Sequence, residues 1–327
     1  MPLPPPLRGR LKLPLVAAPM FRVSGPELVI ACCREGVAGT LPAFNRQSSA
    51  ELSDWLAQIA TALPADAAPY GVNLLVHRTN RRLQADLAVC CRWRVPLIIT
   101  SVGFDAEVIA AVHAYGGVVF HDVVNRAQAE KAARHGVDGV VCLAAGAGGQ
   151  TGWVSPFALV QEVRQVYAGC ILLAGGLNSG YDLAAAQLLG VDLGWMGTRF
   201  LATRESLADA DYKRRVLEAG CADIVCTSAL SGLPANVLRS SLDAAGIAAD
   251  ADPGKIDVSE RMLGAGAGVW QQVQSVGHGV GGIADIPSTQ ALCARLRDEY
   301  AQAQVRLRSA QEDFQAHGMG ARPVPPQ

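Results

Sequence analysis

Short apolar runs recur at regular intervals along the chain, and alanine- and leucine-rich stretches separate them. The runs are nearly continuous in Val, Ile, Leu and Ala, which is typical of parallel strands covered by helices. We therefore expect strands at Leu15–Ala18, Val37–Leu41, Tyr70–Leu75, Pro96–Ser101, Gly117–His121, Asp138–Ala144, Cys170–Ala174 and Asp192–Met196.

The stretches between these strands carry residues that begin and end helices. Pro26 and Pro156 suit the first turn of a helix, because that turn needs no N–H donor there. Gly36, Gly136 and Gly190 each come just before an expected strand, where a glycine often ends a helix. Regular alternation predicts a parallel sheet, and eight units favour a closed (β/α)₈ TIM barrel over an open sheet.

The regular alternation of strands and helices ends after Phe200. Helices are expected there over Ser206–Ala219, Ala235–Ala245 and Ser288 to about Gln311. Glycine-rich stretches at 264–268 and 275–282 separate the later elements, and Asp252–Gly254 is typical of a turn. This pattern predicts an appended, mostly helical lid lobe on the substrate side of the barrel. The expected units are a barrel over 11–200, the lid lobe over 201–282, a C-terminal helix packing on the barrel over 283–312 and a disordered tail over 313–327.

The composition of the chain limits the classes of molecule that it is expected to bind. The chain has 327 residues, 50% of them hydrophobic, which is enough for one large core. A net charge of −1 and only 6% aromatic residues argue against nucleic acid as a partner. No apolar run approaches the ~18 residues of a membrane span, and the proline-rich N-terminus lacks a signal-like apolar segment. We therefore expect a cytoplasmic protein with a small-molecule substrate; a homodimer is one open alternative.

The nine cysteines point to the same compartment. Their number is odd, no CxxC spacing occurs, and Cys142 and Cys170 lie inside apolar strand runs. We expect them to be reduced and mostly buried, and we expect no metal site.

Two glycine turns follow the last two expected strands: Gly175-Gly176, before Leu177, and Gly197-Thr198, after Met196. Glycine lets backbone N–H groups approach an anion closely, and the next helix offers its positive end. In a (β/α)₈ barrel, turns after neighbouring late strands form a phosphate cradle at the carboxyl ends of the strands. The pair therefore predicts a phosphorylated cofactor, although each turn alone is also a common strand–helix junction.

The other strand ends are rich in glycine, amides and hydroxyls, which suits a planar hydrogen-bonding cofactor better than a metal. Asn73 needs a partner for its amide, and either a flavin edge or a neighbouring loop would supply one. Thr100 and His121 are further candidates, although a lone histidine is more often part of a core. Gly146–Gly149 lets the backbone pass close to a flat group or forms a flexible loop.

Taken together, these segments resemble the nitronate monooxygenases (the 2-nitropropane dioxygenase family), over roughly residues 11 to 300. The matching segments are Ala17–Met20, Gly71–Leu74, Ala145–Gly149, Gly175-Gly176, Met196–Phe200 and Gly277–Gly282. Proteins of this family are FMN-dependent (β/α)₈ barrels, related to bacterial enoyl-acyl-carrier-protein reductases. The resemblance implies that FMN binds with its ring against the backbone of Ala18, Pro19 and Met20, with Asn73 at its edge. It implies a phosphate site at Gly175, Gly176, Leu177, Met196, Gly197 and Thr198, with Thr100, His121, Gly148 and Gly149 as further cofactor contacts.

One departure concerns the catalytic group. The family usually has a histidine where this chain has Gln150, and a glutamine where this chain has His278. Glutamine accepts no proton at ordinary pH. Either His278 reaches the flavin from the late loop and restores an imidazole, or the base is lost; a third alternative is that His278 is only a loop residue.

The resemblance implies an oxidoreductase that oxidises alkyl nitronates to a carbonyl compound and nitrite with oxygen. Gln150 would bond the nitro oxygens, and His278 or His121 would supply the imidazole. Two alternatives stay open. One is an NAD(P)H-dependent FMN reductase of enones, quinones or enoyl thioesters; the other is a flavin-binding protein with little turnover.

Overall fold

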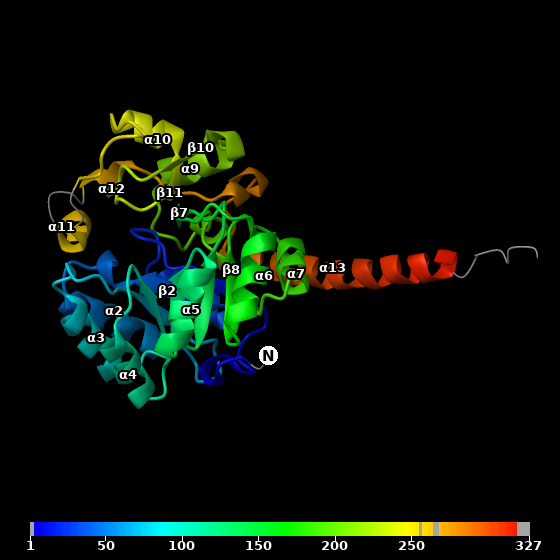
Figure 1. The fold of residues 1–327 in the computed structure, drawn as a ribbon, viewed down its shortest axis with the longest axis horizontal. Coiled ribbons are helices and arrows are strands. Elements are labelled where there is room, and N and C mark those ends of the chain that lie inside the picture. The colour runs from blue at the N-terminus through cyan, green and yellow to red at the C-terminus, as the bar shows by residue number, and fades with distance from the viewer. Residues whose placement is uncertain (1–2, 255–256, 264–267, 319–327) are drawn as a thin grey trace, which may run out of the picture.

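A closed barrel of eight parallel strands forms the centre of the computed structural model, which describes residues 3–254, 257–263 and 268–318 (Figure 1). β9 closes the barrel on β1, with Gly194 opposite Leu15. Every strand expected from the sequence is present, and the (β/α)₈ barrel is confirmed. In barrel order the strands are β1 (Leu15–Ala17), β2 (Ala38–Pro42), β3 (Gly71–Leu75), β4 (Leu97–Ser101), β5 (Val118–Val123), β6 (Gly139–Leu143), β8 (Cys170–Ala174) and β9 (Leu193–Met196).

One helix follows each strand. Pro26 and Pro156 occupy first turns, and Gly136 ends its helix in the left-handed region with φ 71°, as expected. The helices are α1 (Pro26–Arg34), α2 (Ser49–Ala62), α3 (Leu83–Arg92), α4 (Ala106–Ala114), α5 (Arg126–His135), α6 (Pro156–Val166), α7 (Gly180–Leu188) and the short α8 (Thr198–Leu201).

The strands supply two separate apolar layers. Leu97, Ile99 and Phe120 fill the barrel interior, whereas Ile98 and Val119 pack against the helices outside. Successive side chains of a strand point to opposite faces, so each strand contributes to both layers. The same alternation decides which residue at the end of each strand faces the barrel mouth.

The segment between α8 and the last helix lies over one end of the barrel (Figure 1). Its elements are α9 (Ala210–Glu218), β10 (Ile224–Thr227), β11 (Ala235–Leu238), α10 (Arg239–Ala244), α11 (Val258–Leu263) and α12 (Val269–Gln272). β11 lies between β10 and the two-residue β7 (Gly149–Gln150), which belongs to the loop after β6. The glycine loop after β6 is therefore partly a strand that ties this segment to the barrel.

Two helix predictions in this segment need correction. The helix expected over Ala235–Ala245 is wrong in its first part, because β11 is fully buried and pairs on both edges; tertiary pairing overrides the helical preference of alanine here. The helix expected from Ser206 begins only at Ala210, because the side chain of Asp209 caps it by accepting from the Tyr212 N–H.

The last helix, α13 (Thr289–Gly318), packs against α7 and α1 and then projects away from the barrel (Figure 1). It runs past the expected end near Gln311, so the tail predicted from residue 313 is helical as far as Gly318. Residues 319–327 and the glycine-rich positions 264–267 lie outside the described residues.

All nine cysteines are free, and Cys142 and Cys170 are buried, as expected. Within the described ranges, no helix is long and apolar enough to cross a membrane. Nor do three or more His, Cys, Asp or Glu side chains of the described residues form a group that could hold a metal ion.

Candidate active site

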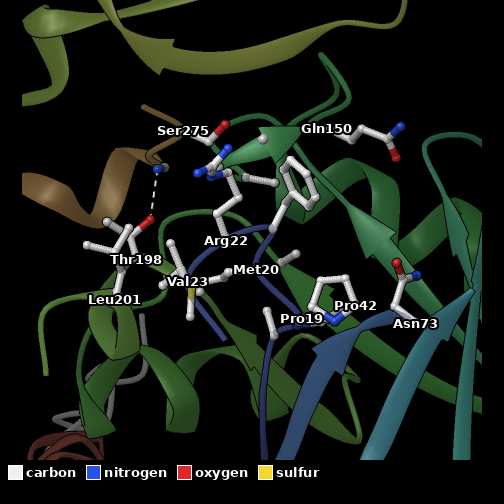
Figure 2. A pocket seen from close by; sticks show the side chains of 18 of the residues that line it. Pro19, Met20, Arg22, Val23, Pro42, Asn73, Gln150, Thr198, Leu201 and Ser275 are labelled. Carbon is white, nitrogen blue, oxygen red and sulfur yellow. Dashed lines mark hydrogen bonds between the residues drawn. The ribbon is translucent and has the colours of Figure 1, made fainter. Parts of the chain in front are cut away.

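A cavity of about 390 Å³ opens at the carboxyl ends of the barrel strands (Figure 2). Its size lies within the usual range of ligand pockets. Met262, Trp270 and Val273, from the segment over the barrel, line it together with the strand ends. The cavity is therefore enclosed between the barrel and that segment.

Most candidate site residues meet in this cavity. In Figure 2, Thr198 and Asn73 lie toward opposite ends, and Pro19 and Met20 lie between them. The candidates that line the cavity are Ala18, Pro19, Met20, Asn73, Gly148, Gly149, Gln150, Gly175, Gly176, Leu177, Gly197 and Thr198.

The two glycine turns lie side by side, because β8 and β9 are neighbours in the barrel. Gly175 and Gly176 have φ values of 129° and 77°, which other residues adopt only with strain. A Cβ on Gly176 would meet no atom within 4 Å, so its backbone faces open space. The turn therefore leaves its backbone accessible to a ligand.

The start of α7 differs from the expectation. Ser179 and Asp182 form a capping box, and the Asp182 carboxylate accepts the N–H groups of Asn178 and Ser179 at 2.9 and 2.8 Å. The positive end of this helix is already neutralised by its own aspartate. The capacity to bind an anion at this turn rests with the backbone of Gly176 and Leu177.

Thr198 links the second turn to the late glycine-rich loop. Its Oγ1 accepts the Gly277 N–H at 2.9 Å, shown as a dashed line in Figure 2. The hydroxyl hydrogen of Thr198 is then available to a group in the cavity. Gly148 packs in the same place, because a Cβ there would come within 2.7 Å of the Gly277 nitrogen. Three separate loops therefore meet at Thr198.

Asn73 begins a row of polar side chains along the inner wall. Its Nδ2 donates to the Ile99 carbonyl at 3.3 Å and to Ser101 Oγ at 2.8 Å, so its Oδ1 is left to the cavity. Ser101 Oγ in turn donates to Asp122 Oδ2 at 2.6 Å. Ser101 and Asp122 both line the cavity, although neither was among the sequence candidates.

Thr100 and His121 do not line the cavity, and their expected contact with the cofactor is not supported. They lie one residue before Ser101 and Asp122, so strand alternation turns them toward the helices. His121 Nδ1 and Thr100 Oγ1 are 2.7 Å apart, and the imidazole lies 3.8 Å from the Phe104 ring. Burial lowers the pKa of His121 to about 4, with smaller contributions from His135 and Lys131. His121 is a neutral core histidine.

Met196 and His278 are also outside the cavity lining. The Met196 side chain is buried toward the helices with Leu15 and Leu28, because it alternates with Trp195, which faces inward. His278 is exposed, and its ring packs against Gly146, where an added Cβ would come within 3.0 Å of the imidazole. The idea that His278 restores an imidazole at the flavin is therefore not supported by its position.

Arg22 is a cavity residue that the sequence did not single out. Its φ of 61° is in the left-handed region, and Asn45 Oδ1 holds it there by accepting the Arg22 N–H at 2.6 Å. Asn45 is itself fixed, since its Nδ2 donates to the carbonyls of Met20 and Ser24. The guanidinium extends into the cavity in Figure 2 and forms no salt bridge within the described part of the chain. The sequence feature that could have indicated Arg22 is its position in the loop after the first strand.

The residues present fit a long, flat, phosphorylated cofactor. One end of the cavity offers glycine backbone and the Thr198 hydroxyl, and the other offers the Asn73 carbonyl oxygen. Between them the wall is formed by Ala18, Pro19 and Met20, which are apolar.

Residues 78–296 match the sequence profile described as nitronate monooxygenase. The chain belongs to the nitronate monooxygenase family. Proteins of this family are oxidoreductases, and the cofactor class of the family is a flavin.

Two relatives and one solved structure illustrate the likeness. A Mycobacterium tuberculosis protein named (3aS,4S,5R,7aS)-5-hydroxy-7a-methyl-1-oxo-octahydro-1H-indene-4-carboxyl-CoA dehydrogenase is 31% identical over 70% of this chain and 64% of its own length. A nitronate monooxygenase from Paraburkholderia phytofirmans is 27% identical over 76% of this chain and 78% of its own. The crystal structure of nitroalkane oxidase from Streptomyces ansochromogenes superposes with a TM-score of 0.77 at 25% identity, covering 92% of this chain and 99% of that one. The alignment with the dehydrogenase thus spans less than two thirds of that relative.

Proposed function

We propose that this member of the nitronate monooxygenase family is an FMN-dependent enzyme that oxidises alkyl nitronates to a carbonyl compound and nitrite with oxygen. The observation that carries the proposal is the meeting of both glycine turns, Arg22 and Gln150 in one cavity. The backbone at Gly176, Leu177 and Gly197, with the Thr198 hydroxyl, would hold the phosphate. No cluster of basic side chains is needed, because backbone amide and hydroxyl donors can stabilise the negative charge of the phosphate.

A flavin bound here would supply the electron-transfer chemistry between the substrate and oxygen. The protein's part is to hold both reactants and to exclude water. Asn73 Oδ1 would accept an N–H from the ring edge, because its Nδ2 is already used by Ile99 and Ser101. Gln150 can donate its amide hydrogens to the nitro oxygens.

Arg22 supports an anionic substrate. An arginine held at φ 61° stores backbone strain of roughly 1–3 kcal/mol, and such strain is usually retained where it orients a functional group. Arg22 is exposed and its guanidinium forms no salt bridge within the described ranges, so it is available to pair with a bound nitronate. The charge also offsets the cost of moving the anion out of water.

The test is the absorption spectrum of the purified protein under anaerobic mixing. We expect a flavin spectrum that ethyl nitronate bleaches and that NADH and NADPH leave unchanged. A colourless protein that FMN cannot reconstitute would refute the cofactor assignment. A flavin that none of these compounds bleaches would instead indicate a binding protein with little turnover.

A second candidate is a flavin oxidoreductase that acts on an acyl thioester. The relative named as a carboxyl-CoA dehydrogenase favours it, as does the apolar upper wall formed by Met262, Trp270 and Val273, which suits a hydrocarbon group. Rapid bleaching by NADPH, followed by reoxidation with an enoyl-CoA, would favour this candidate over the nitronate reaction.

A further inference from the structure

Asp122 places a carboxylate in the inner wall of the cavity. β5 turns His121 toward the helices and Asp122 toward the barrel interior, beside Ser101 of β4. Asp122 Oδ2 accepts the Ser101 hydroxyl at 2.6 Å. Its Oδ1 is buried and has no hydrogen-bond partner among the described residues.

The direction of the hydrogen bonds is determined by Asn73. Its Nδ2 can only donate, so Ser101 Oγ accepts there and must use its own hydrogen toward Asp122. This row orients the carboxyl group through Oδ2 and leaves the lone pairs of Oδ1 unsatisfied. A buried carboxylate oxygen without a partner costs free energy, and such a group calls for a functional explanation.

The surroundings of Asp122 suit proton transfer. Burial raises its pKa from 3.8 to about 6, and the Ser101 hydrogen bond opposes this rise. No charged side chain of the described residues contributes to that pKa; the polar neighbour that does is Ser101 on β4. Near neutral pH the group is a carboxylate that can accept a proton and later release it.

The other titratable groups that line the cavity either form hydrogen bonds within the protein or cannot accept a proton near neutral pH. Asp209 caps α9, and the Tyr212 hydroxyl donates to the Ser275 carbonyl at 2.6 Å. Burial raises the pKa of Tyr212 above its ordinary value, and the guanidinium of Arg22 offers hydrogen-bond donors but no acceptor. Among the described residues that line the cavity, Asp122 is therefore the group suited to accept a proton.

We propose that Asp122 is a catalytic residue that takes a proton from the α-carbon of a neutral nitroalkane, so that the enzyme generates its own nitronate. This inference rests on the proposed function. The Cα–H bond breaks and its electron pair forms the C=N bond of the nitronate, while the π pair of one N=O bond moves onto its oxygen. The proton goes to the Asp122 carboxylate. No electron leaves the substrate in this step. The proton returns to water after each turnover.

The experiment compares nitroethane with preformed ethyl nitronate on the FMN-loaded enzyme, by oxygen uptake. Asp122→Asn keeps the shape of the side chain and removes the base. We expect its turnover of nitroethane to fall about 100-fold or more, the usual contribution of a general base. Turnover of ethyl nitronate should change only a few-fold, and the flavin spectrum should show that the variant is loaded.

A second measurement does not depend on oxidation. Under anaerobic conditions in D₂O, nuclear magnetic resonance follows exchange of the α-hydrogens of nitroethane. We expect the wild-type protein to accelerate exchange and Asp122→Asn to abolish this acceleration. Ser101→Ala, which keeps the carboxyl group, should retain exchange with its pH dependence moved to higher pH, because the hydrogen bond that favours the charged form is lost.

The outcomes separate the two proposals. If the wild type oxidises ethyl nitronate but neither oxidises nitroethane nor exchanges its α-hydrogens, this inference is wrong and the proposed function stands. Equal nitroethane turnover by Asp122→Asn and the wild type would also overturn it. Failure of the wild type on both substrates, with α-hydrogen exchange intact, would overturn the proposed function and leave the role of Asp122.

Discussion

Replacing Asp122 by asparagine should stabilise the folded protein at alkaline pH. The pKa of this carboxyl is about 6 in the folded protein, against an ordinary value of 3.8, because burial disfavours its charged form. Each pH unit between the two values is worth about 1.4 kcal/mol, so ionised Asp122 destabilises the folded state by about 3 kcal/mol. Asparagine avoids this cost, and its Oδ1 can still accept the Ser101 hydroxyl. Its Nδ2 would take the unpartnered position of the other oxygen, at a cost of about 1 kcal/mol at every pH.

The sign of the pH dependence follows from the raised pKa. Below about pH 4 both the folded and the unfolded protein carry a neutral Asp122, so the variant gains nothing. Between pH 4 and 6 the unfolded chain ionises first, and the cost of Asp122 grows. Above about pH 6 the cost is fully present. The advantage of Asp122→Asn should therefore appear as pH rises through this window and then stay constant.

Urea unfolding followed by tryptophan fluorescence at pH 8, 6 and 4 measures this difference. We expect a net gain of about 2 kcal/mol at pH 8, a smaller gain at pH 6 and none at pH 4. Asp54→Asn, at an exposed position on α2, removes the same charge from the surface and serves as the control. If Asp122→Asn is no more stable than the wild type at pH 8, or if its gain is the same at every pH, the reasoning is refuted.

Two further predictions concern the loops of the cavity. Gly148→Ala places a Cβ within 2.7 Å of the Gly277 nitrogen, so it should destabilise the protein by about 1–3 kcal/mol in thermal unfolding and weaken FMN binding. Gly220→Ala, whose Cβ would meet its nearest neighbour at 3.9 Å, should do neither, and equal behaviour of the two would contradict the loop packing. Arg22→Met should raise KM for ethyl nitronate about 10- to 100-fold in steady-state kinetics, the worth of a hydrogen bond to a charged group. Loss of FMN from this variant would show instead that Arg22 holds the cofactor.

The barrel was predictable because its signal is local and repeated. Each strand is a short apolar run bounded by glycine or proline, and no long-range information is needed to see eight of them. The prediction was wrong at β11, where alanine and leucine indicate a helix but two partner strands are present. Pairing with β7 depends on a loop that lies far earlier in the chain, so no local pattern could reveal it.

By itself the sequence determined the turn at Gly175-Gly176, because a left-handed φ is a local requirement that only glycine meets without strain. It could not determine which residue of each strand end faces the cavity. Both faces of these strands are apolar, so the sequence does not show which residues point into the barrel and which point toward the helices. The register of the closed barrel made that choice, bringing Ser101 and Asp122 into the cavity and turning Thr100 and His121 away. Burial then raised the pKa of Asp122. That property comes from the surrounding protein, so the tertiary structure alone decided it.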